Sequence, residues 1–190
     1  LLSELEHFCA RYPHVRIRLL NYSAPQAVKA LENNIIDFAI VSTPVLVHKH
    51  MHQEKLVSYD EILLGGTKYK QFAQQVHYLE DISEMPLIGL CEGSSTHTHY
   101  SRFFMEHDLP FEPDMEAAMT DQVLPMITHN LGIGFYPKSL ALEAIEKELV
   151  FPIELTEPLP NRDVVVITNN HTPINSAARR FLEFLLENRK

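Results

Sequence analysis

Cysteine is scarce in this sequence of 190 residues, and so are positive charges and long apolar runs. The two cysteines, Cys9 and Cys91, lie far apart and form no disulfide framework, which fits a reducing cytoplasm. Lys and Arg number 16 against 25 Asp and Glu, which argues against a nucleic-acid-binding surface because phosphate contacts need clustered cations. No apolar run approaches the ~20 residues of a membrane span, and the sequence has no internal repeat.

What the sequence does contain is typical of a folded globular protein, with 45% hydrophobic and 22% charged residues. This length fits one or two domains. Leu1 falls inside the apolar pattern of a first helix, and no capping residue precedes it. We therefore expect further chain upstream of Leu1.

The first sixty residues predict a strand–helix–strand unit. The opening helix ends before Pro13, and residues 15–19 alternate as in a half-buried strand. Ser23 and Gln26 form the two ends of a capping box, so a helix begins there. The near-continuous apolar run at residues 36–41 is typical of a buried parallel strand. Polar, histidine-rich residues follow, up to Glu54.

The rest of the chain continues this alternation of strands with helices. It predicts strands at 62–64, 86–90, 114–118, 133–136, 149–155 and 162–168, and helices at 96–107, 120–129, 139–147 and from Thr172-Pro173 onward. Such an order predicts an α/β fold with mainly parallel sheets, and the number of short elements favours two small subdomains. Ligands in these folds bind beyond the carboxyl ends of the strands, at helix N-termini.

The turn Gly93-Ser94-Ser95-Thr96 places three hydroxyl groups at such a helix start. Free N–H groups and the positive end of the helix dipole suit a carboxylate there, whereas capping alone needs one hydroxyl. Thr120 is predicted to cap the next helix, either with or without facing the same ligand. Pro125 inside that helix removes a hydrogen bond and can bend its axis.

Two other patterns suggest different chemistry. His48, His50 and His52 would share one face of an extended segment, and with Glu54 they could bind zinc, although a solvated loop is the alternative. Gly89-Leu90-Cys91-Glu92-Gly93, between a strand and a helix, mimics the nucleophile elbow of hydrolases. Cys91 is otherwise a strand-end thiol packed as a small hydrophobic group.

Three segments together resemble the effector-binding (substrate-binding) domain of LysR-type transcriptional regulators of bacteria, in the family's order and over essentially the whole chain. They are Phe8…Tyr12-Pro13…Val15-Arg16-Ile17-Arg18-Leu19 with Val28…Leu31…Ile36-Asp37-Phe38-Ala39-Ile40, then Leu131-Gly132-Ile133-Gly134-Phe135-Tyr136-Pro137, and finally Ser176-Ala177-Ala178-Arg179-Arg180-Phe181-Leu182-Glu183-Phe184-Leu185.

The resemblance implies two Rossmann-like subdomains joined by two crossover strands, as in type 2 periplasmic binding proteins. The first would comprise residues 1–67 plus 155–190 and the second residues 68–154. It further implies an N-terminal winged helix-turn-helix domain and a first strand of this domain, both lying outside the chain. DNA would be bound only through that missing domain, in a cytoplasmic homodimer or tetramer without membrane contact.

The resemblance also implies a small effector, which the hydroxyl-rich turns predict to be a carboxylate or other anion, in the cleft between the subdomains. The predicted effector-binding residues are Ser94, Ser95, Thr96, Thr120, Ser23, Ser42, Thr43 and Phe135, although turn chemistry or core packing could account for several of them. The family's dimer interface would use the first helix and the helix at 96–107, through Leu5, Phe8, Tyr100, Phe103 and Phe104, unless these aromatic rings face their own core.

We therefore predict an effector-sensing regulatory domain with no catalytic residue, no metal site and no cofactor. A free-standing solute-binding protein shares the fold and is the first alternative. A cysteine hydrolase built on Cys91 is the second.

Overall fold

A computed structural model describes residues 2–187, which divide into two units. Unit 1 is formed by the two ends of the chain, up to Val57 and from Asp163 onward, and unit 2 by Ser58–Arg162. The chain therefore passes between the units twice, at residues 57–58 and 162–163. The sequence placed these passages at 67–68 and 154–155, and they differ because the strands next to them hydrogen-bond into the sheet of unit 2.

Unit 2 contains most of the helices and strands. In chain order it comprises β3 (Glu61–Gly66), η1 (Thr67–Tyr69), η2 (Phe72–Gln74), β4 (Val76–His77), α3 (Leu79–Ser83), β5 (Leu87–Leu90), α4 (Ser95–Met105), β6 (Met115–Ala117), α5 (Thr120–Thr128), β7 (Ile133–Pro137), α6 (Lys138–Glu146) and β8 (Val150–Leu155). Its six strands form one sheet in the order β4-β8-β3-β7-β5-β6.

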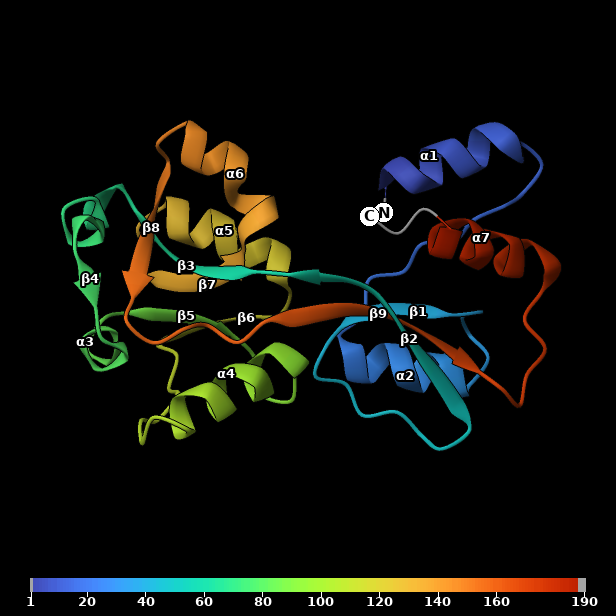
Figure 1. The fold of residues 1–190 in the computed structure, drawn as a ribbon, viewed down its shortest axis with the longest axis horizontal. Helices are drawn as coiled ribbons and strands as arrows, with labels where there is room; N and C mark the ends of the chain where they lie inside the picture. Colours follow the sequence, from blue (N-terminus) through green and yellow to red (C-terminus); the bar gives the residue numbers. More distant parts are fainter. Residues whose placement is uncertain (1, 188–190) are drawn as a thin grey trace. The chain divides into compact units, whose positions relative to one another are not determined.

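The sheet of unit 2 is mixed, and β4 runs parallel to β8 at one end of it. β5, β6 and β7 run parallel to one another, whereas β3 is antiparallel to both β7 and β8. Alternate side chains of each strand face opposite sides, so Leu63 packs towards α4 and Leu64 towards α5. Helices α3 and α4 thus cover one face and α5 and α6 the other (Figure 1).

Unit 1 is a smaller three-layer arrangement of α1 (Leu2–Arg11), α2 (Ala24–Glu32), β1 (Ala39–Ser42), β2 (Met51–Tyr59), β9 (Arg162–Asn169) and α7 (Ser176–Glu187). The strands lie in the order β1-β9-β2. Along β9, Val165 and Ile167 pack with α2, whereas Val166 packs with Phe8 of α1 and Phe181 of α7. This alternation places α2 on one face of the sheet and α1 with α7 on the other (Figure 1).

The predicted strand at residues 15–19 is wrong, because residues 15–23 carry neither helix nor strand. Within residues 2–187, β1 lies at the edge of its sheet and pairs only with β9, antiparallel to it, so residues 15–19 add no strand to its other side. Residues 15–22 and 35–41 instead line a groove of about 660 Å³ within unit 1. The expected parallel strand–helix–strand unit is therefore absent from the described part of the chain.

The structure also gives the starts of β2 and α7. The sequence left the histidine-rich stretch open as an extended segment or a solvated loop, and β2 begins within it, at Met51. Its side chains are mostly exposed, so it lacks the apolar alternation by which a strand is recognised. The last helix begins at Ser176 rather than at Thr172, and Asn175 accepts a hydrogen bond from the Ala178 N–H group at its start.

Candidate functional site

The N-terminus of α4 stands at the carboxyl end of β5, where the sequence predicted a ligand. Gly93 adopts a φ of +82°, a conformation that favours glycine, and so turns the chain into the helix. The Ser94 hydroxyl oxygen accepts a hydrogen bond of 3.1 Å from the His97 N–H group, and Ser94 is only 8% exposed. Ser94 is therefore the cap, which leaves the half-buried Ser95 and Thr96 in the first turn for other partners.

The second predicted helix start differs in one residue. The N-cap of α5 is Met119, so Thr120 is the first helical residue and the prediction that Thr120 is the cap is wrong. The Gln122 side-chain oxygen accepts hydrogen bonds from the N–H groups of Ala118 and Met119, at 2.9 and 3.1 Å. Gln122 thus satisfies the N–H groups of the two residues before the helix rather than those of its first turn, and Pro125 is accommodated inside the same helix.

Both helix starts lie at one edge of the sheet of unit 2. β5 and β6 are parallel neighbours with Leu90 opposite Ala117, and the Cys91 N–H group donates to the Ala117 carbonyl oxygen at 3.0 Å. The carboxyl ends of parallel strands meet at the same edge, so α4 and α5 direct their positive ends to it. The arrangement suits an anion held by backbone N–H groups and hydroxyls.

A buried ion pair that the sequence analysis missed lies in the same unit. The Arg162 Nη1 atom donates to the Glu61 Oε1 atom at 3.0 Å, and each side chain is only 3% exposed. Glu61 pairs with Pro137 across β3 and β7, and this register brings it to the carboxyl end of β7. Glu61 begins β3 and Arg162 begins β9, 101 positions apart, and no local pattern predicts that these two strand starts meet.

Tyr100 joins this ion pair from α4. Its hydroxyl donates to the Glu61 Oε2 atom, and burial raises the pKa of Tyr100 well above its ordinary value, with the Glu61 charge as a further cause. The hydroxyl therefore stays protonated and acts as a donor. Burial, aided by the Arg162 charge, lowers the pKa of His99 to about 4, so its ring is neutral at pH 7.

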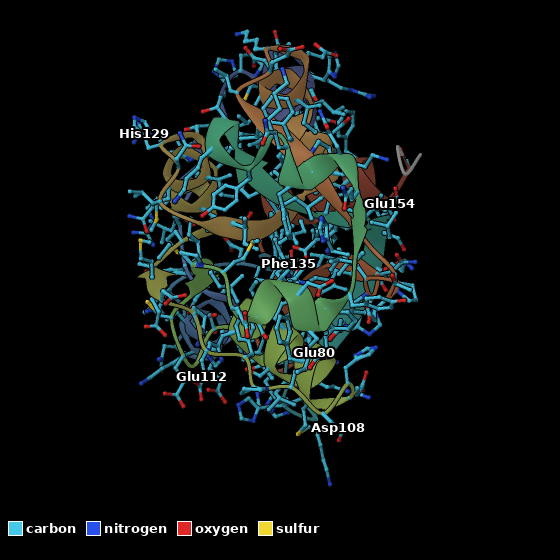
Figure 2. The ribbon with its side chains drawn as sticks, turned by 90° about the vertical axis from the view of Figure 1, so that its left-hand side faces the viewer. Glu80, Asp108, Glu112, His129, Phe135 and Glu154 are labelled. Carbon is cyan, nitrogen blue, oxygen red and sulfur yellow. The ribbon has the colours of Figure 1, made fainter. Side chains whose placement is uncertain are left out.

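Phe135, a predicted effector contact, lies inside unit 2. It is 7% exposed, and its ring stacks on that of Tyr100 with a centroid distance of 4.2 Å. Figure 2 shows Phe135 in the interior, whereas Asp108 and Glu112 lie at the periphery. Its environment is therefore that of a core residue supporting α4.

The three hydroxyl residues predicted in unit 1 occupy turn positions. Ser23 is the N-cap of α2, and its N–H group donates to the Gln26 side chain at 3.0 Å, which is half of the predicted capping box. Ser42 ends β1. The Thr43 hydroxyl oxygen accepts from the Asp163 N–H group at 3.0 Å, so it connects the end of β1 to β9.

The aromatic residues predicted at a dimer interface are buried inside their own units. Phe8 packs with Phe181, whereas Tyr100, Phe103 and Phe104 belong to the core of unit 2. These rings thus face their own cores, the second possibility that the sequence left open, and a dimer interface on α1 and α4 stays a prediction. Leu5 is half-buried and packs against the same cluster as Phe8.

Within residues 2–187, neither the histidine-rich stretch nor Cys91 joins a cluster of metal-ligating side chains. The rings of His48 and His50 stack at 5.6 Å, and that of His50 stacks on His171 at 4.6 Å. Among residues 2–187, no three His, Cys, Asp or Glu side chains gather as metal ligands do. The half-buried Cys91 is a free thiol without a histidine hydrogen-bonded to its sulfur in that same range.

Removing the hydroxyl of Ser94 should destabilise the chain. Ser94→Ala loses the side-chain acceptor for the His97 N–H group at the start of α4, and such a loss costs about 1 kcal/mol. Urea denaturation followed by circular dichroism measures it. Ser95→Ala, one residue along the same turn, removes no cap and should change the free energy of unfolding much less. Equal effects would contradict the assignment of Ser94 as the cap.

These features define an α/β domain in two units, with helix N-termini gathered at the carboxyl edge of a sheet as in binding proteins for small ligands. The chain matches the family described as LysR substrate binding domain over residues 1–190, and it belongs to this family. It is thus an effector-binding regulatory domain of the LysR type, and the α/β fold class predicted from the sequence is confirmed.

Comparisons with individual proteins agree. The chain is 22% identical over 144 residues to the HTH-type transcriptional regulator GltR of Bacillus subtilis (strain 168), covering 76% of this chain and 47% of that protein. The chain thus spans about half the length of this relative. The CcmR regulatory domain of Synechocystis PCC6803 in complex with 2-PG superimposes with a TM-score of 0.87 at 16% identity, covering 100% of this chain and 90% of that one.

A second solved structure also has a fold similar to that of this chain. The effector binding domain of QuiR in complex with shikimate has a TM-score of 0.83 at 16% identity, covering 99% of this chain and 89% of that one. Within residues 2–187, none of the helices combines the length and the apolar character that crossing a bilayer requires.

Proposed function

We propose that the chain senses a small anionic metabolite, most simply a carboxylate, at the edge of unit 2 where α4 and α5 begin. The observation that carries this proposal is the division of roles in the turn before α4. Ser94 is occupied as the cap, whereas Ser95 and Thr96 and their N–H groups precede the first intrahelical hydrogen bond. Thr120, half-buried in the first turn of α5, would be a further contact.

The remaining predicted contacts are three hydroxyl residues of unit 1 and Phe135 of unit 2. Ser23 and Ser42 stand at a helix start and a strand end of unit 1, where hydroxyls serve as turn residues and remain capable of binding an anion. The Thr43 oxygen has one backbone partner already. Phe135 would act indirectly, by packing beneath Tyr100. Shikimate, bound by the QuiR domain, is itself a carboxylate, which supports this ligand class.

For the whole protein we infer a cytoplasmic, non-enzymatic transcriptional regulator in which a DNA-binding domain outside this chain contacts the promoter. The net charge of -9 supports leaving DNA binding to that other domain. A homodimer or tetramer would use the outer faces of α1 and α4, because their large aromatic rings are buried. Leu2 and Met105 are exposed apolar residues on these two helices. The effector would act through different affinities for two states of the protein.

A thermal-shift screen of the chain against carboxylates and phosphorylated metabolites tests the effector site. A ligand at 100-fold its dissociation constant stabilises the folded state by about 2.7 kcal/mol, which raises the melting temperature by several degrees at this size. We expect Ser95→Ala to abolish the shift. Ser101→Ala, two turns further along α4, is the matched control and should keep it. A shift that survives Ser95→Ala unchanged would contradict binding at this turn.

A further inference from the structure

Tyr100, Glu61 and Arg162 form one buried, hydrogen-bonded group in unit 2. Glu61 uses both carboxylate oxygens, one for the Tyr100 hydroxyl and one for the Arg162 guanidinium. All three side chains are nearly inaccessible to solvent. Burying two opposite charges is weak evidence of a stabilising role, because apolar residues of similar volume often stabilise as well or better. The positions of these residues in the fold indicate a conformational role instead.

Two of the three residues lie beside the two chain passages between units. Glu61 is three positions after Ser58, the first residue of unit 2, and Arg162 is its last residue. The Arg162 guanidinium also lies 5.8 Å from the centre of the ring of Tyr59, at the end of β2. The ion pair consequently joins the segment that enters unit 2 to the segment that leaves it.

The third residue connects these passages to the candidate effector turn. Tyr100 lies on α4, five positions after Ser95, within the same rigid helix. Its ring is held by stacking on Phe135, so its hydroxyl cannot follow Glu61 independently of the helix. A displacement of α4 must either move Glu61 with it or leave buried polar groups unpaired, which is costly. A group of this kind has discrete arrangements rather than a continuous range.

We propose that the Tyr100–Glu61–Arg162 group is the coupling element that links the N-terminal turn of α4 to both passages between the units. Tyr100 is a positioning residue in this scheme and does not itself contact the effector. The proposal rests on the proposed function for the identity of the turn as the effector site. The mechanical link within unit 2 is independent of which ligand binds there, so it can be tested without one.

Hydrogen–deuterium exchange of the ligand-free chain tests the link. Tyr100→Phe keeps the ring and its stacking but removes the hydroxyl, and we expect exchange to rise about tenfold or more at the hydrogen-bonded amides of residues 97–98 and in residues 58–61 and 161–164 together. Tyr69→Phe is the matched control, because the buried hydroxyl of Tyr69 has no hydrogen-bond partner and its ring belongs to the same apolar cluster. This control should leave all three segments unchanged.

If exchange rises only in α4 of Tyr100→Phe, the coupling is overturned. An equal rise in exchange in Tyr69→Phe would overturn it as well. A general increase over the whole of unit 2 would indicate a purely structural role and would overturn it as well. Urea denaturation of both variants, run in parallel, identifies a variant that has simply lost its fold. If Tyr100→Phe has lost its fold, Arg162→Lys takes its place, because it alters the other hydrogen-bond partner of Glu61.

Sulfate, as the simplest anion for the turn, adds a second test against sodium chloride at matched ionic strength. In the unmodified chain, we expect sulfate to slow exchange at 95–98 and also at 58–61 and 161–164. In Tyr100→Phe the protection should remain at 95–98 only. Protection limited to 95–98 in the unmodified chain would overturn the coupling. Absence of protection at 95–98 would contradict the proposed anion site, while the ligand-free comparison still decides the coupling.

Discussion

Replacing Arg162 by methionine should lower the free energy of unfolding by about 3–5 kcal/mol, as expected when a buried ion pair loses one partner. The reason is the carboxylate left behind. Glu61 is 3% exposed at its side chain and keeps the Tyr100 hydroxyl as a donor, but it loses the guanidinium 3.0 Å away. Urea denaturation followed by circular dichroism measures the loss.

Two comparisons separate the buried charge from ordinary substitution effects. Arg102→Met breaks the exposed pair between Arg102 and Glu106, whose atoms are also close, at 2.8 Å, and this should cost well under 1 kcal/mol because water screens the charges. The combined variant Glu61→Leu, Tyr100→Phe and Arg162→Met removes every polar member of the group. It should regain most of the stability, since none of these three residues then keeps a buried charge or hydroxyl. Equal losses for Arg162→Met and Arg102→Met would refute the argument.

The combined variant also distinguishes stability from coupling. If the group existed only to hold unit 2 together, an apolar replacement of similar stability would be functionally equivalent. If the group transmits the state of α4, the combined variant should be stable and yet insensitive to the effector. In that case stability and response are separate quantities, and the same three residues determine both.

Local patterns in the sequence were sufficient to predict the elements that present the candidate site. Gly93 and the hydroxyls after it predicted the start of α4, which the structure places at Ser95. Gly132 and Gly134 marked β7, where a Cβ atom on Gly132 would come within 2.4 Å of the Pro86 carbonyl oxygen. These signals are local: they depend on a turn, a cap or a close approach of neighbouring strands.

What the sequence could not predict depends on partners far away in the chain. Residues 15–19 have the alternation of a strand, but alternation does not supply the hydrogen-bonded neighbour that a strand needs, and they form none. β2 is a strand despite a polar sequence, because its partners in the sheet determine its conformation. The same holds for Glu61 and Arg162, which are 101 positions apart and meet only in the folded chain.

The aromatic residues of α4 show a different limit. Tyr100, Phe103 and Phe104 are spaced so that they share a helix face, and this spacing predicts an apolar face without saying what covers it. In the structure the sheet of unit 2 covers it, with Phe135 against Tyr100 and Phe104. Composition alone cannot separate a core from an interface, because both bury the same residue types.

Phe135→Ala should destabilise the chain by about 3–5 kcal/mol, the range for truncating a buried aromatic ring. The ring is 7% exposed and contributes to the core cluster between β7 and α4, so its removal leaves a cavity beneath Tyr100. The lost stacking on Tyr100 accounts for about 0.5–1.5 kcal/mol of this. Thermal and urea denaturation of the variant measure the effect.

Phe135→Leu is the comparison that separates packing from effector contact. Leucine fills most of the cavity, so the stability loss should fall to about 1 kcal/mol, and a ligand that acts at Ser95 should still raise the melting temperature. Loss of the ligand shift in this nearly stable variant would mean that the ring itself touches the effector. Retention of the shift would mean that Phe135 acts through Tyr100. The hydroxyls and N–H groups of the turn would then bind the ligand, while the core beneath determines how far α4 can move.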